Sequence, residues 1–276
     1  MPELPEVETV RRGLTALVKE AIIEKVDLPY PKAVTSDLKA FQEEPVGKTI
    51  EAIERRGKYL LFRLSGDQTI VSHLRMEGQY SVEPKGATPH KHTEVIFTLK
   101  DDRVLFYNDT RRFGRMTLVK TGDELTQVSG LKDLGPEPTE EDLSLDYMKQ
   151  IFKKSKRLIK PFLLDQSNIA GLGNIYTDEV LWQTRIHPET TTDKISAQKI
   201  RELRENIISE IARATKHHGT TVHSFSNVFG EVGKFQNELD VYGRAKLPCR
   251  RCETPLEKIK VGQRGTTFCP KCQKKK

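Results

Sequence analysis

The first eighteen residues carry the clearest hydrophobic pattern of the chain. Apolar side chains recur there at steps of three and four, namely Leu4, Val7, Val10, Leu14, Leu17 and Val18. This spacing places them on one stripe of a helix. Pro2 and Pro5 stand near the start, where a helix tolerates proline, and glutamates follow in the first turns, where the helix dipole favours negative charge. Segment 1–18 is therefore predicted to contain an amphipathic helix.

Short apolar runs separated by turn residues follow this helix. They cover residues 22–28, 49–53, 59–64, 69–74, 94–99, 104–107 and 116–119. Since most of them have no helical pattern between them, they are expected to be strands of a sandwich or flattened barrel. Residues 37–42 are compatible with one short helix.

The pattern changes near residue 134. The stretch LGPEP at 134–138 indicates an extended linker, and helical periodicity follows at 146–152 and, most strongly, at 196–217. Between them, residues 159–181 predict a helix, a glycine-rich turn and a second helix that Asn174 would cap. Backbone amides at such a helix start can bind phosphate, although a simple helix connection is an equal alternative. We expect domains at 1–133, 134–240 and 241–276.

Composition describes a globular protein whose positive charge is concentrated at one end. The 276 residues are 36% hydrophobic and 31% charged, with a net charge of +7. Residues 241–276 alone carry +9, which leaves about −2 for the other 240. A basic segment suits a polyphosphate partner, because each phosphate contact releases counterions. No apolar run reaches the roughly 20 residues needed to span a bilayer, and the acidic start is unlike a signal peptide, so an intracellular protein is expected.

The four cysteines predict a metal site. They form two C-x2-C pairs separated by sixteen residues: Cys249, Cys252, Cys269 and Cys272. This is the spacing of a zinc ribbon, in which each pair forms a knuckle and the intervening stretch a hairpin. Disulfides are the alternative, but an intracellular chain keeps its thiols reduced. Four thiolates close the coordination sphere, so one structural Zn²⁺ is expected.

The N-terminus offers a candidate nucleophile. If Met1 is removed, Pro2 becomes a secondary amine with a pKa near 8, so that a useful fraction is neutral at physiological pH. Attack on a sugar C1′ would form an iminium ion, and Glu3 could transfer the protons. A proline at position two is common, however, and the segment can equally be an ordinary terminal helix.

Three stretches together resemble bacterial formamidopyrimidine-DNA glycosylases. They are PELPEVETVRRGL at the start, GLGNIY at 171–176 and the four-cysteine ribbon, and the resemblance runs in order through the whole chain. It implies a multidomain α+β fold with an N-terminal β-sandwich, a helix-two-turn-helix module and a zinc ribbon. Double-stranded DNA with oxidised bases or abasic sites would bind across the cleft between the halves of a monomeric, cytoplasmic, nucleoid-associated bacterial enzyme.

The resemblance also implies catalytic roles. Pro2 would be the nucleophile and Glu3 a proton donor, in a bifunctional glycosylase and lyase acting on 8-oxoguanine opposite cytosine and on formamidopyrimidines. Lys58 matches a lysine that transfers protons during β-elimination and holds phosphate. Arg264 matches an arginine that grips phosphates and aids δ-elimination. Without the resemblance, both would be solvated residues, Lys58 at a strand start and Arg264 in a hairpin.

Further matches concern the DNA. Extruding a damaged nucleotide costs a few kcal/mol, so side chains must fill the vacancy. Met76 and Phe113 match the wedges, and Arg111 matches the arginine that bonds the orphaned cytosine. On strand alternation alone, Met76 would instead be a core methionine on the face of Ile70. Four residues correspond to phosphate contacts: His73, His92, Lys160 and Asn174.

One segment departs from the family. The loop at 219–236 corresponds to the one that closes over the extruded base, but His218 stands where a second glycine is usual and His223 where a basic residue is common. Two other functions stay open. A sister group, endonuclease VIII, prefers oxidised pyrimidines, although Met76, Arg111 and Phe113 argue against it. A non-catalytic zinc-ribbon DNA-binding protein would result if Met1 is retained.

Overall fold

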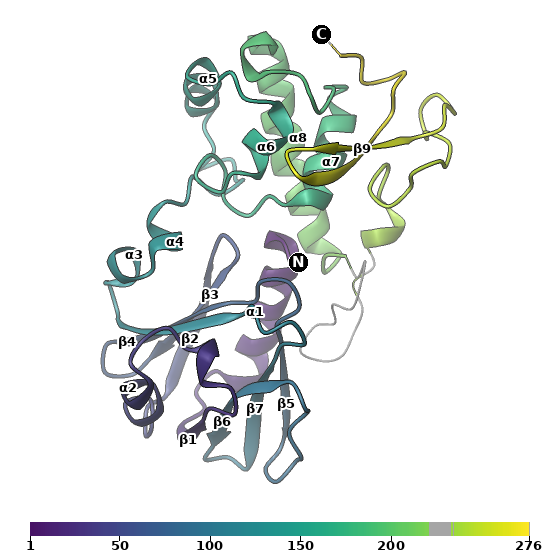
Figure 1. Ribbon diagram of the computed structural model, residues 1–276. Coiled ribbons are helices and arrows are strands. Elements are labelled where there is room, and N and C mark those ends of the chain that lie inside the picture. The colour runs from purple at the N-terminus through teal and green to yellow at the C-terminus, as the bar shows by residue number, and fades with distance from the viewer. Residues whose placement is uncertain (221–232, 234, 276) are drawn as a thin grey trace. The chain divides into compact units, whose positions relative to one another are not determined.

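A computed structural model of the chain describes residues 1–220, 233 and 235–275, which form two compact units (Figure 1). Unit 1 consists of Met1–Asp133 and His217–Lys234, and unit 2 of Leu134–Lys216 and Phe235–Lys276, each as far as its residues are described. The boundaries that the sequence suggests after residues 133 and 240 stay predictions. His223 lies outside the described residues.

Unit 1 is the predicted β-sandwich. One antiparallel sheet has the order β1 (Ile23–Asp27), β6 (Thr93–Leu99), β7 (Arg103–Asn108), β5 (Gln79–Pro84). The other has the order β2 (Ile50–Arg56), β3 (Tyr59–Leu64), β4 (Gln68–His73), β8 (Arg115–Lys120). Apolar side chains from both sheets form a single core.

Helix α1 (Leu4–Val18) packs on that core, as its periodicity predicts. Val7, Val10 and Leu14 are buried among the strands' side chains. Shorter helices complete the unit: η1 (Pro31–Ala33), α2 (Leu38–Glu43), α3 (Glu124–Gln127) and α4 (Ser129–Lys132). The helix predicted near residues 37–42 is therefore confirmed, and Asp37 caps it by accepting the Ala40 amide.

The strand alternation expected for Met76 is wrong. Strand β4 ends at His73, and the chain then turns, with Arg75 in the left-handed region at φ 54° and the Gly78 amide donating to the Leu74 carbonyl. Met76 stands in this turn, half-buried and outside the core, while Leu74 is buried. Because of this turn, the Met76 side chain does not pack in the core of the sandwich.

Unit 2 consists of helices and one hairpin. The helices are α5 (Leu145–Lys153), α6 (Ile159–Leu164), α7 (Asn174–Gln183), η2 (Thr192–Lys194), α8 (Ala197–Lys216) and η3 (Phe235–Asn237). The hairpin joins β9 (Glu257–Val261) to β10 (Arg264–Phe268). The predicted capping by Asn174 is wrong: Gly173 is the N-cap of α7, and Asn174 is the first helical residue. Among the described residues, no helix combines the length and apolarity that crossing a bilayer requires.

Candidate functional site

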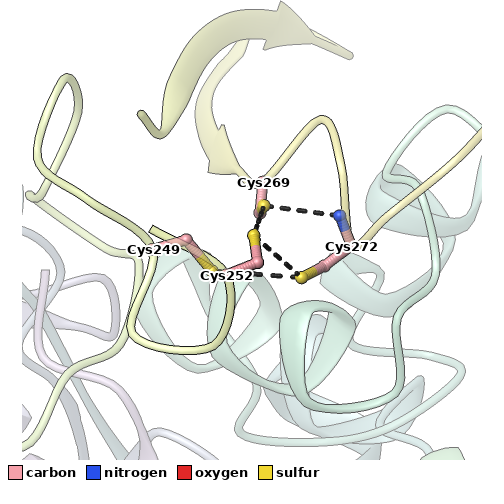
Figure 2. A group of neighbouring side chains, drawn as sticks. All are labelled: Cys249, Cys252, Cys269 and Cys272. Atoms are coloured by element: carbon pink, nitrogen blue, oxygen red, sulfur yellow. Dashed lines mark hydrogen bonds between the residues drawn. The ribbon is translucent and has the colours of Figure 1, made fainter. Parts of the chain in front are cut away.

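The four cysteines lie together in unit 2 and fit a zinc ion (Figure 2). Their sulfur atoms all lie within 4.8 Å of one another, and Cys252 Sγ is 3.5 Å from the sulfurs of Cys269 and Cys272. Cys249 Sγ is 4.0 Å from Cys272 Sγ. Tetrahedral zinc with bonds of about 2.3 Å places its sulfurs about 3.8 Å apart, whereas a disulfide requires about 2 Å. The cluster therefore suits Zn²⁺ and not two disulfides.

The surroundings of the cysteines hold them in place. Trp182 of α7 donates its Nε1 proton to Cys249 Sγ at 3.4 Å, and the Arg251 guanidinium lies 3.6 Å from the centre of the indole ring. Gln273 accepts the amide of Cys269 at 2.8 Å and donates to the Ile186 carbonyl at 2.9 Å. Such outer contacts orient metal ligands. No open coordination position is left for substrate, so the zinc is structural.

The start of the chain lies in a cluster of charged side chains in unit 1. The terminal amine interacts with Glu3, Glu6, Lys58 and Glu77. Burial is the largest influence and lowers the pKa of this Met1 amine below its usual 8.0, while the glutamates act in the opposite direction. Burial and the charge of Lys58 therefore favour the neutral, nucleophilic form of the amine, against the effect of the glutamates.

Lys58 is held at this cluster by a tight turn. It follows Gly57, whose φ of 57° allows the two-residue connection from β2 to β3. The Lys58 side chain is only 5% exposed, which rules out the solvated surface lysine that the sequence alone would allow. The structure therefore brings together Pro2, Glu3 and Lys58, three of the four residues expected to be catalytic.

Glu6 links this cluster to residue 220. One carboxylate oxygen accepts the Glu3 amide at 2.9 Å, and the other accepts the Thr220 amide at 2.7 Å. Glu6 is 2% exposed, and a Cβ on Gly219 would approach its Oε1 to 2.6 Å. Sequence reasoning missed this role, because the two partners are 214 residues apart.

His73 lies at the end of β4, opposite Tyr59 of β3. Its Nδ1 accepts the Arg75 amide at 2.9 Å, and its ring packs edge-on against Tyr59. Burial, together with the charges of Arg75 and Lys58, lowers the pKa of His73 to about 3. The imidazole is therefore neutral and carries its proton on Nε2, a state suited to donating one hydrogen bond to a phosphate oxygen.

Arg111 and Phe113 are presented by a loop that is organised by Asp109. This carboxylate is fully buried and accepts the amides of Arg111 and Phe113, each at 2.9 Å, and of Gly114 at 2.7 Å. The Phe113 side chain is 47% exposed, and the Arg111 guanidinium lies 5.0 Å from its ring centre. An exposed aromatic ring and an arginine on a fixed loop can stack on a base and read its edge.

Thr110 and His92 lie next to the loop that Asp109 organises in unit 1. The hydroxyl of Thr110 donates to Glu77, which links the loop to a carboxylate near the terminal amine. His92 is half-buried, its carbonyl accepts the Asp109 amide, and its Nδ1 has no hydrogen-bond partner in the part of the chain that the structure describes. The pKa of His92 is lowered by burial and by Lys91.

The expectation that Lys160 contacts phosphate needs correction. Its side chain is 0% exposed, and its Nζ donates to Asp178 Oδ1 at 2.6 Å and to the Gly265 carbonyl at 3.1 Å. A buried ammonium with these partners has no surface to offer a phosphate. Asn174 likewise donates to the Gly265 carbonyl, at 3.0 Å. Both residues therefore bind the hairpin next to Arg264, which is exposed.

Comparisons with known proteins agree with this architecture. Family models match in three places: the formamidopyrimidine-DNA glycosylase N-terminal domain at residues 1–116, its H2TH domain at 134–226, and a zinc finger found in FPG and IleRS at 246–275. The zinc-finger match and the cysteine geometry together show one structural zinc site.

Similar proteins cover the chain almost completely. The formamidopyrimidine-DNA glycosylase of Lactiplantibacillus plantarum is 60% identical over 98% of both chains, and that of Pediococcus pentosaceus is 56% identical over 99% of both. Lactococcus lactis Fpg in complex with DNA containing N7-benzyl-Fapy-dG superimposes with a TM-score of 0.94, at 43% identity over 99% of this chain and 100% of the other. Its complex with abasic-site DNA gives the same TM-score at 42% identity and the same coverage. The chain therefore belongs to the formamidopyrimidine-DNA glycosylase family.

Proposed function

We propose that this chain is a base-excision repair enzyme, a DNA glycosylase and lyase that removes oxidised purines from duplex DNA. Its main substrates are 8-oxoguanine opposite cytosine and formamidopyrimidines. The observation that carries the proposal is the partly buried amine at the start of the chain, which lies near Glu3, Glu6 and Lys58. The solved complexes of Lactococcus lactis Fpg with DNA containing N7-benzyl-Fapy-dG and with abasic-site DNA support the same substrate class.

The reaction begins at Pro2. After Met1 is removed, the Pro2 nitrogen occupies the same buried surroundings, which lower the pKa of an amine. It attacks C1′ of the damaged nucleotide, the bond from C1′ to the base breaks, and the base leaves with the electron pair and a proton. The deoxyribose ring opens, with Glu3 as proton donor, and C1′ and the nitrogen form an iminium ion.

The iminium then drives strand cleavage. It withdraws electrons and so acidifies the C2′ proton; when this proton leaves, the C3′–O bond breaks in β-elimination. A second proton loss breaks the C5′–O bond in δ-elimination. Lys58 accepts and returns protons during the first elimination, and Arg264 stabilises the negative charge of the departing phosphate.

Side chains of both units contribute to DNA binding. Arg111, Phe113 and Met76 occupy the vacancy left by the extruded base, and His73, His92 and Asn174 lie along the phosphates. Zinc fixes the ribbon and takes no part in bond breaking. The protein works as a monomer on nucleoid DNA in the bacterial cytoplasm.

Incision of defined duplexes tests this function. The purified chain, with loss of Met1 verified by intact mass, is given 8-oxoguanine opposite cytosine and, separately, thymine glycol opposite adenine. We expect faster cleavage of the 8-oxoguanine strand and products that carry phosphate at both new ends. Pro5→Ala, which changes the other proline of the same helix start, is the matched control for a substitution of Pro2 and should cleave normally.

Two results would contradict the proposal. Preference for thymine glycol would favour an endonuclease VIII-like enzyme. Tight DNA binding without cleavage, in a chain that retains Met1, would favour a non-catalytic zinc-ribbon protein.

A further inference from the structure

A buried ion pair joins helices α6 and α7 in unit 2. Lys160 of α6 and Asp178 of α7 are 0% and 1% exposed, and the Nζ–Oδ1 distance is 2.6 Å. Burying two charges costs several kcal/mol per ion before their attraction is counted, so such a pair is weak support for stability as such. The presence of this pair therefore calls for a reason other than stability.

Both members of the pair bind the hairpin β9–β10. Lys160 Nζ donates to the Gly265 carbonyl at 3.1 Å, and Asp178 Oδ2 accepts the Thr267 amide at 3.0 Å. Asn174 adds a second bond to the Gly265 carbonyl. One strand of the hairpin is therefore bound to the helices at two alternate residues, directly after Arg264.

The zinc ligands lie far along the strand from that part of the hairpin. Arg264 lies five residues before the zinc ligand Cys269, which corresponds to about 16 Å along an extended strand. Directly before Arg264, the hairpin turn is formed by Gly262 and Gln263, whose φ values are 53° and 67°. A Cβ on Gly262 would stand 3.1 Å from Pro161 of α6, so the turn also lies close to this helix.

We propose that Lys160 and Asp178 are positioning residues that hold the β9–β10 hairpin on α6 and α7 and thereby orient Arg264 for δ-elimination. The inference rests on the proposed function, in which Arg264 grips the departing phosphate. The pKa of Asp178 is raised to about 6, because burial outweighs the charge of Lys160 and the hydrogen bond from the Thr267 amide, which both favour the carboxylate. In this role both residues act through the hairpin and not on the reacting atoms.

The test compares the products of abasic-site cleavage by the zinc-loaded full chain. Asp178→Asn should retain one zinc per chain and the β-elimination rate within about threefold, while δ-elimination slows at least tenfold. Asp146→Asn removes the exposed partner of Lys149 in α5 and should change neither step. A merely stabilising pair would lower the melting temperature without changing the ratio of β to δ products.

A second background makes the test specific. If Asp178 acts through Arg264, Asp178→Asn should slow δ-elimination no further in an Arg264→Gln chain. Should Asp178→Asn lose zinc or unfold, the double variant Lys160→Met with Asp178→Leu replaces the pair by apolar side chains. That variant removes the bonds to the hairpin, and it should show the same loss of δ-elimination.

Three results would overturn the inference. They are an unchanged product ratio in both the Asp178→Asn and the double variant, additive losses with Arg264→Gln, and an Arg264→Gln chain that performs δ-elimination normally. In the last case, the role of Arg264 in the proposed function fails too, whereas removal of 8-oxoguanine by Pro2 is judged separately by base release.

Discussion

Replacing Asp109 with alanine should disconnect the Arg111–Phe113 loop from the sandwich. The carboxylate is fully buried and accepts three backbone amides at 2.7 to 2.9 Å. A hydrogen bond to a charged group contributes about 1.5–3 kcal/mol, and orphaned buried amides are costly. Because the exposed loop can rehydrate, we expect a loss of about 3 kcal/mol in the free energy of unfolding, less than the sum of three bonds.

The activity should fall selectively in the same variant. With Arg111 and Phe113 no longer held, base extrusion loses its supporting side chains, so single-turnover excision of 8-oxoguanine opposite cytosine should slow at least tenfold. Cleavage of an abasic site, which has no base to extrude, should stay within about threefold. Asp109→Asn keeps one acceptor oxygen and should lie between wild type and Asp109→Ala in both stability and excision.

Urea unfolding and single-turnover kinetics on the two duplexes measure these effects. Asp101→Asn, which changes an exposed carboxylate between β6 and β7, is the control and should leave excision unchanged. The reasoning is refuted if Asp109→Ala loses less than about 1 kcal/mol and excises 8-oxoguanine at the wild-type rate. It is also refuted if both substrates slow equally.

Three other predictions concern zinc, pH and packing. Chelation of zinc should change the fluorescence of the single tryptophan, Trp182, which bonds Cys249, and the change should reverse with one equivalent of Zn²⁺; an unchanged spectrum would contradict the site. Burial and the charge of Asp109 raise the pKa of Glu94 to about 7, so its stabilising contribution is complete below pH 4.5 and is lost as the pH rises through 7. Between pH 5 and 8 the wild type should therefore lose about 2–3 kcal/mol of unfolding free energy that Glu94→Gln keeps, and parallel pH profiles would disprove this. Gly114→Ala would place a Cβ 1.6 Å from the buried Tyr107 hydroxyl, so its urea midpoint should fall by the equivalent of about 1–3 kcal/mol, and an unchanged midpoint would argue against the packing.

Local patterns predicted the elements whose causes are local. The periodicity of residues 1–18 gave α1, and the cysteine spacing predicted the zinc site, because both depend on neighbours in the chain. The turn after His73 was missed, because nothing in the neighbouring sequence indicates that the backbone of Arg75 adopts the left-handed conformation. Asp109 could have been found, because an aspartate before a polar loop often accepts the amides that follow it.

Long-range pairing explains what the sequence could not predict. Lysine is a residue type that often contacts phosphate, so Lys160 was expected to do so. Its actual partners are Asp178, which lies on another helix, and Gly265, which is 105 residues away. A local stretch of sequence cannot indicate a pair whose members lie so far apart in the chain. The same holds for Glu6 and Thr220, and for the bond that turns Asn174 toward the hairpin. Burial of a charged side chain is thus the property that the sequence pattern conveyed least.

Borohydride trapping followed by peptide mapping tests the central claim most directly. The chain is incubated with duplex DNA containing 8-oxoguanine, reduced, digested and analysed by mass spectrometry. We predict that the sugar is attached to the peptide that begins with Pro2, and that Pro2→Gly lowers the trapped yield at least tenfold. Attachment to Lys58 or another internal lysine, or full trapping by a chain that still begins with Met1, would contradict the mechanism.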